Sequence, residues 1–381
     1  MSLIQNTVFS QLIQELSFKD FQKNVHALGG DKGTSKISCF SLLKSMIYSQ
    51  FTRKESLREL EDDYTINTKF FEKDDIVSLK KSTVSEALIN RPSTVFENTY
   101  KELVQSLQEK NKISKIRKRL KLLDSTTISL NKNLHDWADF RDTMSGIKMH
   151  ILFDDKSLIP FKTLITNAKV HDSSITDQIN IEKGDTFVFD RGYNDYAFWN
   201  KINKADAFFV TRIKSGTVYS ITSSCKTNNN YGVLKDSEIR LTGSKGKVYP
   251  EKLRLIEYYD EETKKKLYFI TNNFKLIGQT IADYYKRRWQ IELFFKFIKQ
   301  HLKIKKFFSQ SKNGVEIQLY SALITFLLLI KIKVKLTVSI PVFKILRLIR
   351  NALYRKICLY KLLSLGKVVI RKIKQKEALL F

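Results

Sequence analysis

The chain has 381 residues, enough for two or three domains with sizeable cores. Its 67 Lys and Arg outnumber its 39 Asp and Glu, and the net charge of +28 indicates a nucleic-acid partner. Residues 284–381 alone hold 23 Lys and Arg and three Glu. Cys39, Cys225 and Cys358 lack metal-site spacing and predict reduced thiols in a cytosolic protein, and the N-terminus shows no signal-peptide pattern.

Residues 1–110 show apolar residues at spacings of three and four, which predicts a small helical domain. Glycines at positions 29, 30 and 33 mark a turn between two of these helices. Such a pair fits a DNA-binding module or a plain helical bundle, and the sequence leaves both open. After Pro92, the spacing predicts a helix over residues 93–110 with Ser93 as its N-cap.

A basic segment, residues 110–121, carries seven cations and no acid, and is better explained by phosphate binding than by a solubilising surface. The pattern then changes to β-branched residues, and residues 121–130 are predicted to form a strand. Asp124 lies in its middle, where an unpaired carboxylate would be costly to bury. The alternative is an outward-facing or turn-forming Asp124.

More strands are predicted from Gly146 and from Leu158, followed by a short helix capped by Asp172 or Ser173. The apolar strand 186–189 ends at Asp190, before a helix over residues 193–205. Open α/β sheets place their chemistry at such strand ends. A plain capping role for Asp190 is the alternative.

Residues 217–273 stay β-like, with a hairpin turning at residues 260–264. Residues 284–307 then predict one helix with two opposed faces. The apolar face comprises Ile291, Phe294, Phe295, Ile298 and Leu302. The polar face comprises Tyr285, Arg288, Glu292, Lys296, Lys299 and Lys303. Glu292 is either paired with neighbouring cations on a solvated face or an acidic metal ligand among cations that bind a polyanion.

The apolar run 317–330 is interrupted by polar residues and is predicted to be a buried helix too short to span a bilayer. Lysines alternating with apolar residues after it would also suit a membrane surface, a weaker alternative.

Three acids thus stand out in separate elements, namely Asp124, Asp190 and Glu292. Carboxylate oxygens suit Mg²⁺, and two ions about 3.5–4 Å apart can activate the attacking oxygen of a phosphodiester reaction and stabilise the leaving one. The sequence has no His and Cys cluster for zinc, and Ser145 lies in no nucleophile elbow. His135, His150 and His171 have no evident nucleophile beside them.

The residues Tyr285, Arg288, Glu292 and Lys299 match the pattern Y-x2-R-x3-E-x6-K, which resembles the signature of DDE transposases of the bacterial insertion-sequence-four family. The segment Asp190-Arg191-Gly192-Tyr193 resembles that family's second-aspartate motif, and LLDST around Asp124 resembles its first. Residues 20–330 fit in all. Lys148 and His150 also form a K-x-H pattern similar to the family's, although an ordinary place on the strand surface is the default for both.

The resemblance implies an α/β fold with an RNase H-like catalytic core. It implies that Asp124, Asp190 and Glu292 bind two Mg²⁺ ions, with Mn²⁺ as an alternative, and that Asp124 bridges them. It further implies that Tyr285, Arg288 and Lys299 grip a DNA phosphate. Trp289 would stack on an extruded base or pack in the core.

The expected domains are a helical N-terminal domain (1–110) that is a candidate for DNA binding, a core (111–212) with a β-rich insertion (213–275), core helices with Glu292 (276–330) and a basic tail (331–381). The implied function is cut-and-paste DNA transposition. The enzyme would cleave terminal inverted repeats and join them to target DNA, as a homodimer in the bacterial cytoplasm beside the nucleoid and away from membranes. A hairpin intermediate is left open. The alternatives are a nuclease of the same fold without strand transfer and an inactive, transposase-derived DNA-binding protein.

Overall fold

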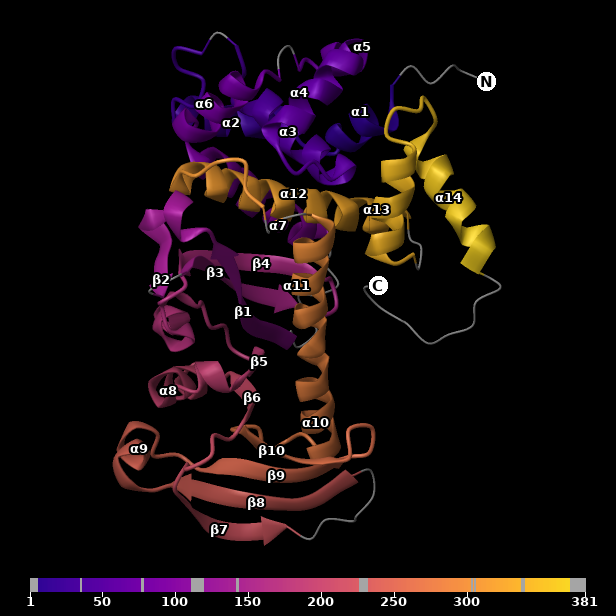
Figure 1. Cartoon of the computed structure of the whole chain (residues 1–381). Helices are drawn as coiled ribbons and strands as arrows, with labels where there is room; N and C mark the ends of the chain where they lie inside the picture. The colour runs from indigo at the N-terminus through magenta and orange to yellow at the C-terminus, as the bar shows by residue number, and fades with distance from the viewer. Residues whose placement is uncertain are drawn as a thin grey trace. The chain divides into compact units, whose positions relative to one another are not determined.

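The computed structural model describes residues 6–34, 36–76, 79–110, 120–141, 144–225, 232–302, 304, 306–336 and 340–370. Most of the basic segment 110–121 and the end of the basic tail therefore lie outside the described residues. The chain divides into two compact units (Figure 1). The first comprises Met1–Asn111, Ile128–Ile147 and Leu293–Phe381, and the second comprises Lys112–Thr127 and Lys148–Glu292. Many helices and a large sheet confirm the α/β class.

The first unit is mainly helical, as expected for residues 1–110. Its helices include α1 (Val8–Ile13), α2 (Phe18–Ala27), α3 (Cys39–Thr52), α4 (Leu57–Ile66), α5 (Thr68–Lys73), α6 (Lys81–Asn90), α7 (Ser93–Lys110), α12 (Lys312–Leu336), α13 (Val342–Asn351) and α14 (Leu359–Ile370). It also holds the short 3-10 turns η2 (Lys132–Leu134) and η3 (Asp136–Ala138) and the strand β2 (Asp139–Arg141).

Helix α12 is the apolar centre of this unit, and it packs against α3, α6, α7 and α13. Its 25 residues exceed the apolar run seen in the sequence, because helical flanks extend that run at both ends. The helix is thus long and apolar enough to cross a membrane, and the expectation that it is too short was wrong. However, 83% of its apolar window is buried inside the protein, which confirms the predicted buried helix.

The cap predicted for α7 differs in detail. Ser93 begins the helix, but its hydroxyl donates to Glu316 Oε2 at 2.7 Å. The Ser93 amide donates instead to Asn313 Oδ1 at 3.0 Å. A side chain from α12 therefore satisfies this helix end, which local sequence could not reveal.

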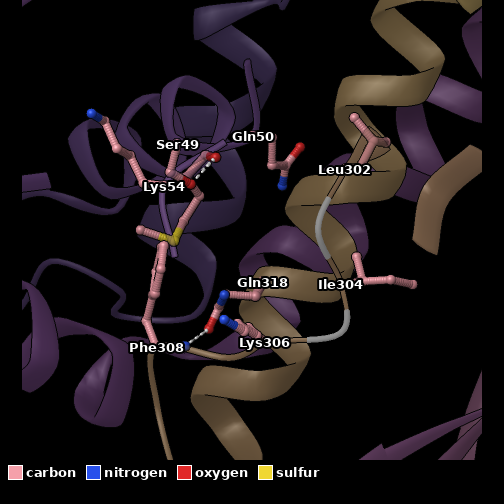
Figure 2. Close-up of a pocket in the computed structure, with 9 residues that line it drawn as sticks. Ser49, Gln50, Lys54, Leu302, Ile304, Lys306, Phe308 and Gln318 are labelled. Carbon is pink, nitrogen blue, oxygen red and sulfur yellow. Dashed lines mark hydrogen bonds between the residues drawn. The ribbon is translucent and has the colours of Figure 1, made fainter. Parts of the chain in front are cut away.

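A small cavity lies in the first unit, lined by Met46, Gln50, Leu302, Phe308 and Gln318 among others (Figure 2). Its volume of about 10 Å³ has room for about one water molecule. It is therefore too small to bind a substrate.

The second unit is built on a sheet. Its strands are β4 (Ile159–Asn167), β5 (Thr186–Phe189), β6 (Phe208–Arg212), β7 (Tyr219–Cys225), β8 (Val233–Leu241), β9 (Leu253–Asp260) and β10 (Lys265–Thr271), together with parts of β1 (Leu120–Leu130) and β3 (Met144–Asp154). The sheet order is β3-β1-β5-β6-β10-β9-β8-β7, with β4 paired to β3 (Figure 1). The predicted strands around Asp124 and Asp190 and the 260–264 hairpin are confirmed.

Strand β5 pairs in parallel with both β1 and β6. Its four residues are all buried, and Phe187 and Phe189 pack with Trp199 of α8 (Tyr196–Lys204) in the core of this unit. Because Leu123 of β1 is paired with Phe189, the last residue of β5, Asp124 in β1 and Asp190 after β5 follow this pair at the same level. The sheet register thus brings two acids together that are 66 residues apart.

Beyond β6 the sheet continues into β10, β9, β8 and β7, and α9 (Gly243–Val248) follows β8. The contacts group these strands with the Asp124 and Asp190 strands in one unit. The division into a core and a separate insertion at residues 213–275 stays a prediction.

The helix predicted over residues 284–307 is divided into α10 (Gly278–Arg287) and α11 (Trp289–His301). Arg288 lies at the junction with right-handed helical backbone angles. The amides of Arg288 and Ile291 bond to carbonyls three residues earlier, so the helix tightens locally there. The predicted apolar face is confirmed, since Ile291, Phe294 and Ile298 are buried.

Candidate active site

The centre of the candidate site is the guanidinium group of Arg288. Its Nη1 donates to Asp124 Oδ2 at 2.8 Å, and its Nη2 donates to Glu292 Oε1. Arg288 and Glu292 are one helical turn apart, which is the predicted local ion pair, whereas Asp124 comes from the middle of β1. The planar fork of arginine thus joins two acids from distant parts of the sequence.

Asp124 is a partly buried carboxylate with a 13% exposed side chain, so the outward-facing alternative is wrong. Its Oδ1 also accepts a hydrogen bond from the Ser125 amide at 2.8 Å. Burial raises the pKa of Asp124 to about 7, Arg288 opposes this, and the charges of Asp190 and Glu292 raise it further. Asp190 and Glu292 therefore act electrostatically on the same carboxylate.

Asp190 directly follows β5, as predicted. Its Oδ1 accepts from the Gly192 amide at 2.8 Å and caps the short turn η5 (Arg191–Tyr193). The plain capping role is thus present, and it accounts for one of the two carboxylate oxygens.

A fourth acid, Asp172, lies beside this group. The Ser125 hydroxyl donates to its Oδ1 at 2.7 Å, and Lys148 Nζ lies 3.4 Å from the same oxygen. A Cβ atom on Gly192 would lie 3.0 Å from oxygens of both Asp172 and Asp190, so this glycine permits their close approach. We call Asp124, Asp172, Asp190 and Glu292 the acidic cluster.

Asp172 was predicted only as a helix cap, and that expectation was wrong. The turn η4 (Asp172–Gln178) is capped by the His171 ring, which accepts from the Ser173 amide at 3.2 Å. The Asp172 side chain is thereby left to face the other acids. No local pattern in the sequence indicated this position of Asp172.

The K-x-H pair supports Asp172 from β3. Lys148 also donates to the Val170 carbonyl at 2.8 Å, and its side chain is 13% exposed. His150 is 1% exposed, so a place on the strand surface is wrong for it. Its ring nitrogens lie 3.1 Å from the Tyr193 hydroxyl and 3.0 Å from Thr166 Oγ1, and burial lowers its pKa to about 4. Tyr193, the last residue of the DRGY segment, is fully buried.

The remaining predicted residues differ in their surroundings. Tyr285 is half-buried against Phe269, and the Arg288 guanidinium lies 5.6 Å from its ring centre. Trp289 is 57% exposed, so core packing is wrong and its ring is accessible. Lys299 lies on α11 in the first unit, and its phosphate-binding role stays a prediction.

The donor chemistry of the acidic cluster fits a hard divalent cation, because every donor is a carboxylate oxygen. Asp124, Asp190 and Glu292 carry three potential negative charges, and Arg288 supplies one bonded positive charge. Among the residues that the structure describes, however, no group of three or more His, Cys, Asp or Glu is arranged closely enough to hold an ion. Arg288 instead bonds the oxygens of Asp124 and Glu292 that an ion would need.

Two family models match parts of the chain. A family model described as a transposase DDE domain matches residues 115–328, a range that includes Asp124, Asp190 and Glu292. A second model, described only as a domain of unknown function, matches residues 4–69.

Three curated relatives are similar over most of the chain. "Putative transposase y4zB" of Sinorhizobium fredii is 35% identical over 72% of this chain and 77% of its own length. "Probable transposase for insertion sequence element IS5377" of Geobacillus stearothermophilus is 26% identical over 65% of this chain and 66% of its own. "Putative transposase for insertion sequence element IS4SA" of Synechocystis is 28% identical over 65% and 70%. The resemblance seen in the sequence is thus confirmed: the chain belongs to the DDE transposase family, and it is an enzyme of DNA transposition.

Proposed function

We propose that this transposase cleaves DNA at the ends of its element and transfers those ends into target DNA, with Mg²⁺ held by Asp124, Asp190 and Glu292. The observation that carries the proposal is the link made by Arg288 between Asp124 and Glu292. The strand order β4-β3-β1-β5-β6, with β1, β5 and β6 parallel, supports an RNase H-like core for these acids.

DDE transposase domains generally use divalent metal ions. When bound, such ions would polarise the phosphodiester and lower the pKa of an attacking water or hydroxyl. Asp124, whose carboxylate feels the charges of both Asp190 and Glu292, would hold the ions together with those two residues. We infer that Arg288 offsets part of the negative charge of the acidic cluster in the resting protein.

The same guanidinium group can bind a phosphate through two parallel hydrogen bonds. In the proposed reaction Arg288 exchanges carboxylate oxygens for phosphate oxygens when DNA binds. Tyr285 would donate its hydroxyl to the same phosphate, and Lys299 would add a further positive charge. The exposed Trp289 would stack on an extruded base, as a hairpin intermediate would require.

The proposed partners are double-stranded DNA with terminal inverted repeats, target DNA and a second copy of the chain in the synaptic complex. The net charge of +28 favours such a polyanionic substrate. A cytoplasmic location beside the bacterial nucleoid is consistent with these partners.

The test uses a labelled duplex that carries the inverted repeats flanking the coding region, incubated with the full chain, target DNA and Mg²⁺. Products are scored as nicks, hairpins and joined ends, with Glu292→Gln as the control. Joined ends that depend on Glu292 support the proposal. Cutting without joining would favour the nuclease alternative. Binding without cutting, unaffected by Glu292→Gln, would favour the inactive DNA-binding protein.

A further inference from the structure

A group of three positive side chains and one histidine in the first unit lies outside the matched signature positions. It begins where α13 meets the end of α3. Arg350 Nε donates to the Phe51 carbonyl at 2.6 Å, in the last turn of α3. Arg53, two residues later, ends that helix with a left-handed backbone (φ 59°). Packing of these two helices therefore brings Arg350 to the segment that carries Arg53.

Helix α11 supplies the other members. His301 is its last residue, and the His301 ring centre lies 4.7 Å from that of Phe343 on α13. Lys296 lies five residues earlier on the same helix. Arg53 and Lys296 are exposed, whereas His301 and Arg350 are partly buried. We call these four residues the cationic cluster.

The charges in the cationic cluster repel one another. Burial lowers the pKa of His301, and Arg53, Arg350 and Lys296 lower it further. Burial, followed by the charge of Arg53, lowers the pKa of Arg350 to about 10. Every charged group that acts on these two side chains in the described part of the chain is a cation.

Two polar atoms in the cationic cluster also lack partners. Arg350 Nη2 and His301 Nδ1 are buried, and neither makes a hydrogen bond within the described residues. Leaving a buried donor without a partner destabilises a fold. Cations are favoured at helix C-termini, and capping of α3 explains why Arg350 Nε bonds the Phe51 carbonyl. It does not explain the unpartnered Arg350 Nη2 or the presence of Arg53 and Lys296 nearby.

We propose that Arg53, Lys296, His301 and Arg350 form a binding site for one phosphate group of the DNA backbone. The proposal rests on the proposed function, because that function supplies the DNA. A phosphate offers several acceptor oxygens, which would satisfy Arg350 Nη2, accept from His301 Nδ1 in the tautomer that carries a proton there, and offset the repulsion. The members of the cationic cluster carry no acceptor that reads a base, apart from a neutral histidine nitrogen, so we expect binding independent of sequence.

The experiment compares duplex binding by the full chain and by the double variant Arg53→Gln, Lys296→Gln, using fluorescence anisotropy in EDTA over a range of salt concentrations. Both positions are exposed, so the thermal midpoint should stay unchanged. Arg350 is left intact because it bonds the Phe51 carbonyl. The matched control is Lys235→Gln, Lys265→Gln, which removes the same charge from exposed positions on β8 and β10.

Loss of one phosphate contact should weaken binding roughly 10-fold near 0.1 M salt and reduce the slope of log K against log salt by about 1. The loss of affinity should be equal for element-end and random duplexes. The control double variant should lose less than half as much affinity. Equal effects in the two double variants, or a loss confined to element ends, would overturn the inference.

A second arm adds inorganic phosphate at constant ionic strength. If phosphate raises the thermal midpoint of the wild type only, while the DNA slope is the same in both proteins, the cluster binds a free anion and the inference is wrong. The proposed function is judged separately by Glu292-dependent joining. If the wild type joins ends and the double variant has the same slope of log K against log salt, only the phosphate site is wrong. If the wild type neither binds nor cuts DNA, both the phosphate site and the proposed function are wrong.

Discussion

The acidic cluster of the second unit and the cationic cluster of the first are both left with unbalanced charge. Arg288 bonds Asp124 and Glu292, while burial and the charges of Asp190 and Glu292 raise the pKa of Asp124. The cationic cluster has no carboxylate among the groups acting on His301 and Arg350 in the described residues. Unbalanced charge is costly in a fold, so its presence in both units supports the two proposed sites for ligands of opposite sign.

Glu15 provides the contrast. Both of its oxygens accept from Lys335, and Tyr360 donates to Oε1 at 2.7 Å, while Lys331 lies 3.6 Å from Oε2. Here the charges and hydrogen bonds are satisfied within the first unit. If unbalanced charge marks function and balanced charge marks stability, substitutions in the acidic and cationic clusters should change DNA cleavage or binding. A substitution at Glu15 should change the stability of the fold.

The largest effect is expected for Glu292→Gln. Loss of a proposed ion ligand should lower the strand-cleavage rate by roughly 10³-fold, because bound metal ions supply several kcal/mol of transition-state stabilisation. The rate is measured on the labelled end duplex, with Asp177→Asn, an 85% exposed acid paired with Lys201, as control. Cleavage at the wild-type rate would remove Glu292 from the site.

Arg288→Lys should cause the next largest fall in the cleavage rate. Lysine keeps the charge but cannot bridge Asp124 and Glu292 with a planar fork, so cleavage should fall by about 10²-fold. Single-turnover rates and duplex affinity are measured together. Full activity in this variant would show that only the charge at position 288 matters.

Asp172→Asn tests the member of the acidic cluster that touches Ser125 and Lys148. It should lower the cleavage rate roughly 10-fold by loosening the support of Asp124 and Asp190, because small displacements of positioned groups are costly. The Mg²⁺ concentration for half-maximal rate should rise, a change that altered stability alone would not produce. The thermal midpoint and the same Asp177→Asn control are recorded in parallel. An unchanged Mg²⁺ requirement would contradict this role.

Glu15→Gln should affect stability and leave cleavage unchanged. Burial raises the pKa of Glu15, but the hydrogen bonds from Lys335 and Tyr360 outweigh it and lower the pKa below its usual 4.5. A lowered folded-state pKa gives stability that is present above pH 4.5 and is lost as pH falls through the folded value. Unfolding free energies at pH 7 should drop by about 1–3 kcal/mol, and the difference should narrow in acid. A difference that persists at low pH would argue against the charged interaction.

Sequence patterns predicted the elements of the site better than its contacts. The strand that contains Asp124, the strand that ends before Asp190 and the buried face of α11 were confirmed, because local apolar spacing reports burial. Asp172 was interpreted as a cap because capping preferences are local, whereas its contacts come from residues 125 and 148. The division of the helix at Arg288 was missed because it is slight: the backbone keeps right-handed helical angles at this residue.

The amino-acid sequence by itself determined the family, the charge and the residue types available for catalysis, since these depend on composition and on motifs within single elements. Only the tertiary structure decided that Arg288 bonds both Asp124 and Glu292, that Asp172 lies beside Gly192, and that Arg350 meets the end of α3. The physical reason is that sheet register and helix packing set distances between residues far apart in the chain, and local patterns carry no information on those distances.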